Sequence, residues 1–244
     1  MKAEYRRKYG YFSTKIAVGL FLLFGIMQFS YIHSTLFLPM EQKATGLLGL
    51  DCDWRDWGIY RMLCWLLPQL SIVFLYGMGL EQRMQGNQYM VLHRIGSRKK
   101  WWRLLEQELW ITVLFFVTLI TALNVGCVFV TEKSLDIEWI LSNVLPAIVC
   151  YTLQIICYLQ IQLCMAVVWN NWKIPMLIIL VLVVTGMYSG AELGQYHYLL
   201  PGSAGMWVRY ENCRSMGSIV TGIVILLVIN VCLYFLGEKG LKRS

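Results

Sequence analysis

The sequence predicts an all-α, polytopic membrane protein with six transmembrane helices, both termini in the cytoplasm and a single domain over residues 1–244. Three observations lead to this prediction. Hydrophobic residues make up 58% of the chain and charged residues only 14%, which is too apolar for a surface in water. Six apolar stretches approach or exceed the length needed to cross a bilayer core of about 30 Å. Lys and Arg are unequally divided among the connections between these stretches.

The six apolar stretches differ in length. The first is longer than a signal-peptide core and no small-residue cleavage site follows it, so we expect it to remain as a helix. The second, third, fourth and sixth are long apolar runs. The fifth is an apolar run only 15 residues long, and it crosses if Ser189, Gly190 and Ala191 extend it, or if the bilayer thins. The predicted helices cover residues 16–38, 59–80, 104–130, 139–168, 174–191 and 218–236.

The orientation follows from the basic residues. Of the 21 Lys and Arg, 15 lie in the N-terminal segment, the second and fourth connections and the C-terminal segment. The positive-inside rule therefore places both termini in the cytoplasm, and we interpret the net charge of +7 as a topology signal and not as a nucleic-acid surface. Eight of the ten tryptophans lie at or near the predicted membrane interfaces, as amphipathic rings prefer. They are Trp54, Trp57, Trp101, Trp102, Trp139, Trp169, Trp172 and Trp207.

Two connections are longer and more structured than simple loops. The cytoplasmic one, 81–103, combines an amphipathic stretch at 87–95 with a Gly-Ser break and a cluster of cations. The outer one, 192–217, has too many apolar residues for a solvated loop and too few to span. We expect a short re-entrant or interfacial helix there, at about 196–207.

The sequence lacks the motifs of common membrane enzymes. It has no HExxH, and its three histidines lie far apart in the chain, at His33, His93 and His197. The GSAG segment at 202–205 is not a GxSxG nucleophile elbow, and a Gly/Pro-rich turn explains it better. No P-loop is present, so the chain cannot itself hydrolyse ATP by the common route. We expect no catalytic residue, cofactor or metal in this chain.

The charged residues and the cysteines give little further evidence for a functional site. The predicted helix cores lack charged residues, and the nearest are Arg61, Glu106 and Glu108 towards helix ends. Most of the eight cysteines lie in apolar runs, where they act as small hydrophobes. Cys52 and Cys213 both fall on the predicted outer side, so they either form a disulfide or remain free thiols.

One polar stripe stands out on the predicted fourth helix. At 100° per residue, four side chains fall within about 80° of one another. The stripe could line a substrate path or contact a second protomer, or it could be a helix–helix contact within the chain, made from small residues and one amide. Its members are Cys150, Gln154, Cys157 and Cys164.

These features together resemble the permease subunits of type-2 ABC exporters. The similarity covers nearly the whole chain and includes the span order, the helical cytoplasmic connection, the partly apolar outer connection and the missing ATPase motif. The segment LHRIGSRKKW at 92–101 resembles the R-x-G-S-R-x-x-W pattern that follows the coupling helix of the class. The chain is most similar to small bacterial permeases of lantibiotic or other antimicrobial-peptide immunity and export systems.

The resemblance implies partners and a mechanism. A cytosolic ABC ATPase dimer would bind ATP and Mg and move a coupling helix at 85–95, and a second permease subunit, identical or homologous, would complete the path. The protein would lie as a multi-pass protein in a bacterial plasma membrane, among lipids and without nucleic acid, and move an amphipathic cargo such as a peptide antibiotic or a lipid-like molecule. The residues implied in ATPase coupling are Tyr89, Met90, Leu92, His93, Arg94 and Arg98.

A different class of function also fits. A non-transporting membrane scaffold or immunity protein would bind its ligand at the outer connection and need no ATPase. It would keep its function after the cytoplasmic connection is disrupted, which an ABC permease would not.

Overall fold

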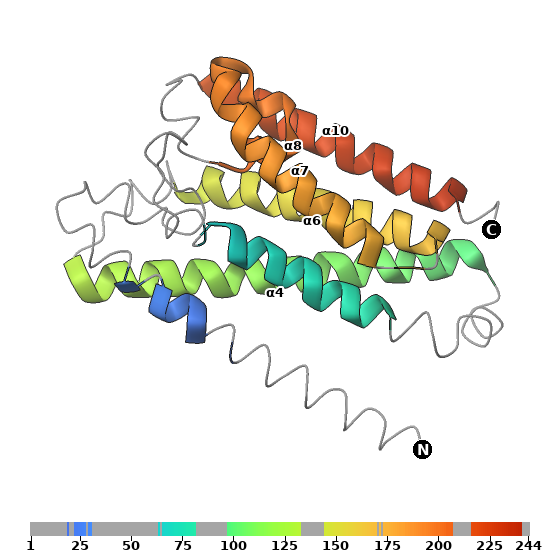
Figure 1. Cartoon of the computed structure of the whole chain (residues 1–244), viewed down its shortest axis with the longest axis horizontal. Helices are drawn as coiled ribbons and strands as arrows, with labels where there is room; N and C mark the ends of the chain where they lie inside the picture. The colour runs from blue at the N-terminus through green and yellow to red at the C-terminus, as the bar shows by residue number, and fades with distance from the viewer. Residues whose placement is uncertain are drawn as a thin grey trace.

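The structure, a computed structural model, is all-helical wherever it describes the chain, which confirms the all-α part of the prediction (Figure 1). Six elements carry labels: α4 (Arg98–Glu132), α6 (Leu145–Trp169), α7 (Lys173–Glu192), η4 (Gly194–Leu199), α8 (Pro201–Ala204) and α10 (Met216–Gly240). Helical residues also occur at 22–27 and 65–81. The described residues are 19, 22–27, 29–30, 63, 65–81, 97–132, 144–169, 171, 173–206 and 216–240.

Three of the described helices are long and apolar enough to cross a membrane. Their qualifying parts are Lys99–Gly126, Leu145–Trp169 and Gly217–Lys239. Helix α7 has a shorter apolar part, Lys173–Gly186, but it continues as helix through the three small residues that the sequence analysis added to it. Much of the first predicted span, 16–38, lies outside the described residues.

Helix α4 begins earlier than the hydropathy pattern predicts. The predicted start was residue 104, whereas the helix starts at Arg98. Basic residues interrupt the apolar run here, but Trp101, Trp102 and Leu105 lie on one helical face and are buried. These two tryptophans are thus at the expected end of the helix but pack inside the protein and not in the lipid interface.

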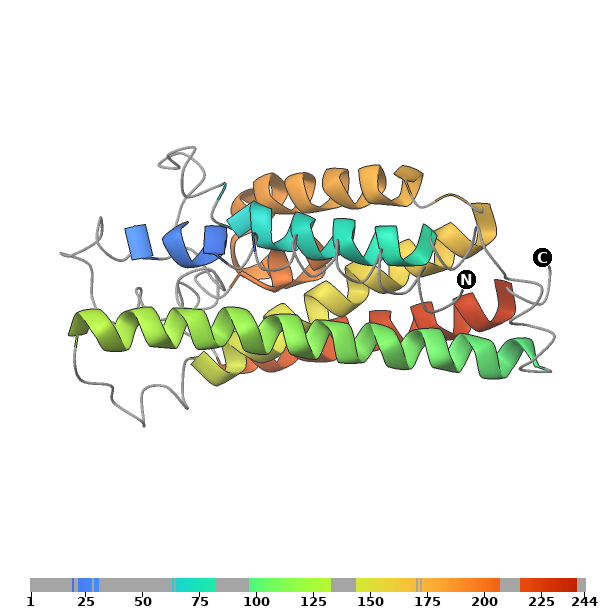
Figure 2. The ribbon, with the colours of Figure 1, turned by 90° about the horizontal axis from the view of Figure 1, so that it is seen from below.

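Helix α6 is the centre of the bundle. It crosses diagonally between α4 and α7 in Figure 2 and also packs along α10. In the most apolar 18-residue stretch of each helix, 67% is buried in α6, 28% in α4 and 17% in α10. Lipid tails are as apolar as these side chains, so packing and hydrogen bonds, more than the hydrophobic effect, must hold α6 to its neighbours.

The two ends of α7 follow from local sequence. Asn171 Oδ1 accepts a hydrogen bond from the Lys173 backbone N–H at 2.9 Å, which satisfies a helix-start donor. After α7, the chain folds back through η4 and α8, with Pro201 in the first turn of α8, where its missing N–H is not needed. Both short helices pack on α7 and α10, in the segment where the sequence analysis expected a short helix.

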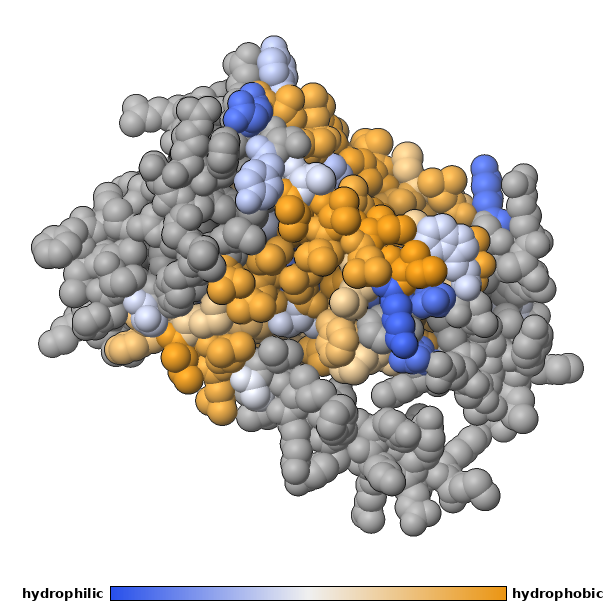
Figure 3. All heavy atoms as spheres, viewed as in Figure 1, coloured by the Kyte–Doolittle hydropathy of each residue, from blue (hydrophilic) through white to orange (hydrophobic). Residues whose placement is uncertain are grey.

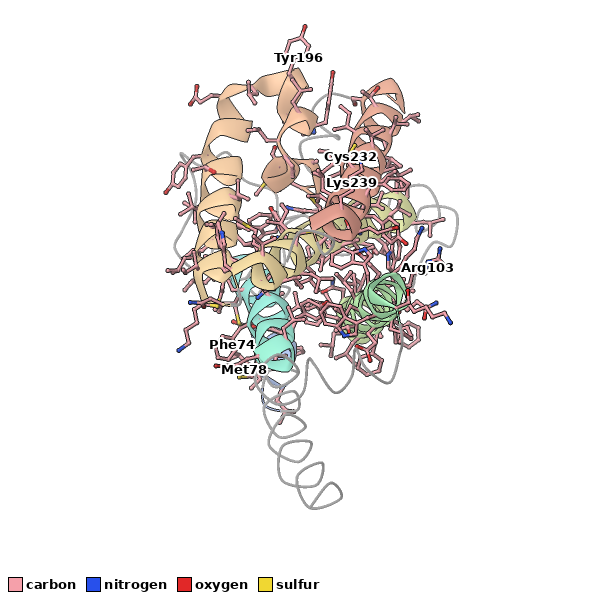
Figure 4. All side chains as sticks on the ribbon, turned by 90° about the vertical axis from the view of Figure 1, so that its right-hand side faces the viewer. Phe74, Met78, Arg103, Tyr196, Cys232 and Lys239 are labelled. Carbon is pink, nitrogen blue, oxygen red and sulfur yellow. The ribbon has the colours of Figure 1, made fainter. Side chains whose placement is uncertain are left out.

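Charge is polarised along the bundle. Apolar residues cover the middle of the described surface in Figure 3, and hydrophilic residues gather towards its ends. The end where α4 and α7 begin and α6 and α10 finish is called here the basic end. Figure 4 looks along the bundle from this end, with Arg103 and Lys239 labelled. All Lys and Arg among the described residues lie at the basic end: Arg98, Lys99, Lys100, Arg103, Lys173 and Lys239.

Candidate functional site

The predicted ATPase-coupling residues fall mainly outside the described part of the chain. Tyr89, Met90, Leu92, His93 and Arg94 are among the undescribed residues. The last of the set, Arg98, is the first residue of α4.

The first turns of α4 are fastened to the end of α10. Lys99 Nζ lies 2.9 Å from Glu238 Oε1. One turn further on, the fully buried Trp102 ring lies against Gly237, where even a methyl group would overlap the indole. The same added methyl would lie 3.0 Å from Cys164 Sγ on α6. Three helices therefore meet at one glycine.

A second contact at the basic end joins α4 to α6 through polar side chains. Gln160 Nε2 donates a hydrogen bond to Glu106 Oε2 at 3.1 Å, and both side chains are buried. One turn along α6, Cys164 Sγ donates to the Leu233 carbonyl of α10 at 3.5 Å. The sequence analysis placed Glu106 near a helix end but did not predict its burial.

The predicted stripe on α6 faces other elements of the same chain. Gln154 is fully buried, and its Nε2 donates to the Gly202 carbonyl of α8 at 3.1 Å and to Tyr158 Oη at 2.8 Å. Cys150 packs with Ile219 and Ile223 of α10. Cys157 is also fully buried. The described contacts are those of the intrachain alternative, and a role in lining a substrate path stays a prediction.

Two pairs of close approaches hold α8 against α7 and α6. A methyl group added at Gly186 would lie 2.5 Å from Gly202 Cα and 2.9 Å from its carbonyl carbon. Gly205 packs so closely on the Gln154 side chain that any side chain there would collide with it. The GSAG segment thus has a structural use: its glycines allow backbone contact with α7 and α6, and Ser203 between them is buried.

Two further hydrogen bonds join α6 to other helices, and the one from Gln162 was missed at the sequence level. Gln162 Nε2 donates to the Val73 carbonyl of the 65–81 helix at 3.1 Å, and Asn230 Nδ2 donates to the Leu153 carbonyl at 3.1 Å. The available signal was the occurrence of three glutamines in the apolar 145–169 stretch, since amides inside a membrane helix usually bond to a neighbouring helix. Helix α6 therefore bonds to four partners: α4, α8, α10 and the 65–81 helix.

No cluster of three His, Cys, Asp or Glu side chains that could hold a metal occurs among the described residues. The cysteines at 150, 157, 164 and 232 are free thiols. Cys52 and Cys213, the pair considered for a disulfide, lie outside the described residues.

Comparison with known protein families, with curated proteins and with solved structures finds no match for this chain.

Proposed function

We propose that this chain is the membrane-spanning permease subunit of an ABC transporter of the type-2 exporter class. It would move an amphipathic substrate, such as a peptide antibiotic or a lipid-like molecule, with ATP hydrolysed by a separate cytosolic subunit. The proposal includes six spans, both termini in the cytoplasm, a second permease subunit and a bacterial plasma membrane.

The packing of the first turns of α4 against α10 is the observation that best supports this proposal. The basic, partly amphipathic segment before α4 has the composition of a coupling element. Directly after it, the Lys99–Glu238 ion pair and the Trp102–Gly237 contact join α4 to α10. A movement of the segment would thus be transmitted to two helices at once, as an ATPase-driven permease requires.

The distribution of charge supports the proposed orientation. All described Lys and Arg residues gather at the basic end, and an excess of cations is typical of the cytoplasmic side. The opposite end carries Glu192 and the η4–α8 turn, which we assign to the outer face as the expected re-entrant or interfacial piece.

The test is affinity purification of the tagged chain from its native membrane in mild detergent, followed by mass spectrometry. The variant is Arg94→Glu, which reverses a charge inside the proposed coupling stretch. The matched control is Lys173→Glu, which makes the same reversal at the basic end but in a different connection. We expect a P-loop ATPase to accompany the native chain and the control and to be lost from Arg94→Glu.

Two results would contradict this proposal in different ways. If no P-loop ATPase accompanies even the native chain, the energy source is missing and the scaffold or immunity-protein function becomes the better explanation. If both charge reversals release the ATPase equally, the basic end attracts it only by general electrostatics, and the assignment of the coupling stretch is wrong.

A further inference from the structure

The contact between Glu106 and Gln160 leaves two oxygen atoms without a hydrogen-bond donor. Glu106 is 4% exposed and Gln160 2% exposed. The single bond between them runs from Gln160 Nε2 to Glu106 Oε2. Glu106 Oε1 and Gln160 Oε1 have no partner among the described residues. Both are pure acceptors if the carboxyl group is ionised, so an ionised pair would bury two unmet acceptors and a charge.

No described cation compensates that charge. Lys99, about two helical turns before Glu106, pairs with Glu238. Arg103, three residues before Glu106, has an exposed side chain and is not among the groups that interact with the Glu106 carboxyl. An uncompensated carboxylate inside a membrane helix bundle is very costly. The other charged or titratable side chains described at this end of the neighbouring elements are Lys100 and Glu108 on α4, Cys164 on α6, Lys173 on α7, Tyr234 and Lys239 on α10, and Tyr76 and Glu81 on the 65–81 helix.

We propose that Glu106 binds a proton and donates it from Oε1 to Gln160 Oε1. A protonated carboxyl group has one O–H donor and a carbonyl acceptor, and a primary amide has the matching N–H donor and carbonyl acceptor. The observed Nε2–Oε2 bond is one half of such an acid–amide pair, and the proton supplies the other half. The pair is then neutral, and every atom left over in the ionised form has a partner.

This proton site does not depend on the transport proposal. The Glu106–Gln160 pair joins α4 to α6 beside the contacts that join α4 to α10. Binding or loss of the proton therefore affects the packing of the whole basic end. Loss of the proton removes one of two interhelical bonds and leaves a buried charge, which favours separation of α4 from α6 and entry of water. The site therefore makes the packing of the basic end sensitive to proton binding.

Infrared spectroscopy of the full-length protein, with heavy-isotope-labelled glutamate carboxyls, tests the proposal directly. At neutral pH we expect one label-sensitive C=O stretch of a protonated carboxylic acid. It should be absent from Glu106→Gln and fully retained in Glu108→Gln, because Glu108 is an exposed glutamate on the same helix. The proposal is wrong if the native protein has no such band, or if the band survives in Glu106→Gln.

A second variant keeps the test informative if Glu106→Gln does not fold. In Gln160→Leu the protonated-acid band should shift to higher frequency, because the acid loses its hydrogen-bond partner. A band unmoved by Gln160→Leu would overturn the pairing.

Thermal unfolding in sodium, potassium or choline buffer distinguishes a proton from a bound metal cation. We expect the same native Tm in all three, to within about 2 °C. A Tm that rises with sodium or potassium concentration in the native chain, but not in Glu106→Gln, would mean that an ionised Glu106 holds a monovalent cation, and the proton site would be refuted.

Discussion

The contact between Gly186 of α7 and Gly202 of α8 leaves no room for a side chain, so Gly186→Ala should displace α8. The added carbon would lie 2.5 Å from Gly202 Cα and 2.9 Å from its carbonyl carbon. Carbon atoms in favourable contact are about 3.5–4.0 Å apart, so the two helices must separate by about 1 Å. Both obstructing atoms belong to the backbone, which means that no side-chain rotation can relieve the overlap.

The magnitude follows from what the displacement breaks. Gln154 Nε2 lies 3.1 Å from the Gly202 carbonyl oxygen, and a further separation of about 1 Å puts the two atoms beyond hydrogen-bonding distance. Strain from overpacking costs about 1–3 kcal/mol and the lost buried hydrogen bond a similar amount. A total of about 2–5 kcal/mol corresponds to a fall in Tm of about 5–15 °C for a chain of this length.

The assay is thermal unfolding of the purified protein in mild detergent, with Gly126→Ala as the matched control. Gly126 is exposed on α4, and a methyl group there meets no atom within 4 Å. Because alanine is a better helix former than glycine, the control should be unchanged or more stable by up to about 1 kcal/mol. If Gly186→Ala is as stable as Gly126→Ala, α8 does not dock on α7 as described and the reasoning is refuted.

Two further predictions concern polar contacts at opposite ends of the bundle. Gln154→Leu removes both hydrogen bonds of the buried amide and should lower the unfolding free energy by about 1–3 kcal/mol. The control Gln107→Leu, at an exposed position of α4, should change it by less than about 0.5 kcal/mol in the same thermal assay. Equal effects of the two variants would contradict the hydrogen bonds of Gln154. Lys99→Glu should lower the unfolding free energy by at most about 1 kcal/mol, because the Lys99 side chain is 55% exposed. The double variant Lys99→Glu with Glu238→Lys should recover that loss. A double variant no more stable than Lys99→Glu would show that the ion pair contributes nothing.

The apolar elements could be predicted well because hydropathy sets their position. The stretch predicted at 218–236 lies inside α10, and the three small residues added to the fifth stretch are helical in α7. The start of α4 could not be predicted in this way. Its first turns are rich in cations, and only the tertiary contact between Trp102 and Gly237 shows that one face of them belongs to the core.

The candidate site was predictable only as a pattern along one helix. Helical spacing groups Cys150 and Gln154 on one face of α6, and in the structure both side chains contact other elements of the same chain. The partners could not be predicted, because Gln154 bonds to a residue 48 positions away and Asn230 to one 77 positions away. Such pairings depend on how helices cross, and a single sequence carries no direct signal for that.

The position of these bonds on α6 bears on how the bundle can move. Gln154 holds α8 and Gln160 holds α4, and six residues separate them, about 9 Å along the axis and about 120° around it. A rotation of α6 by about 20° would shift side-chain ends by about 2 Å and break both bonds together. Asn230 bonds α10 to the Leu153 carbonyl, one residue before Gln154. If one of these helices moves alone, its interhelical hydrogen bonds break, whereas a joint motion preserves them. We therefore expect α4, α6, α8 and α10 to move as one body when the start of α4 is displaced.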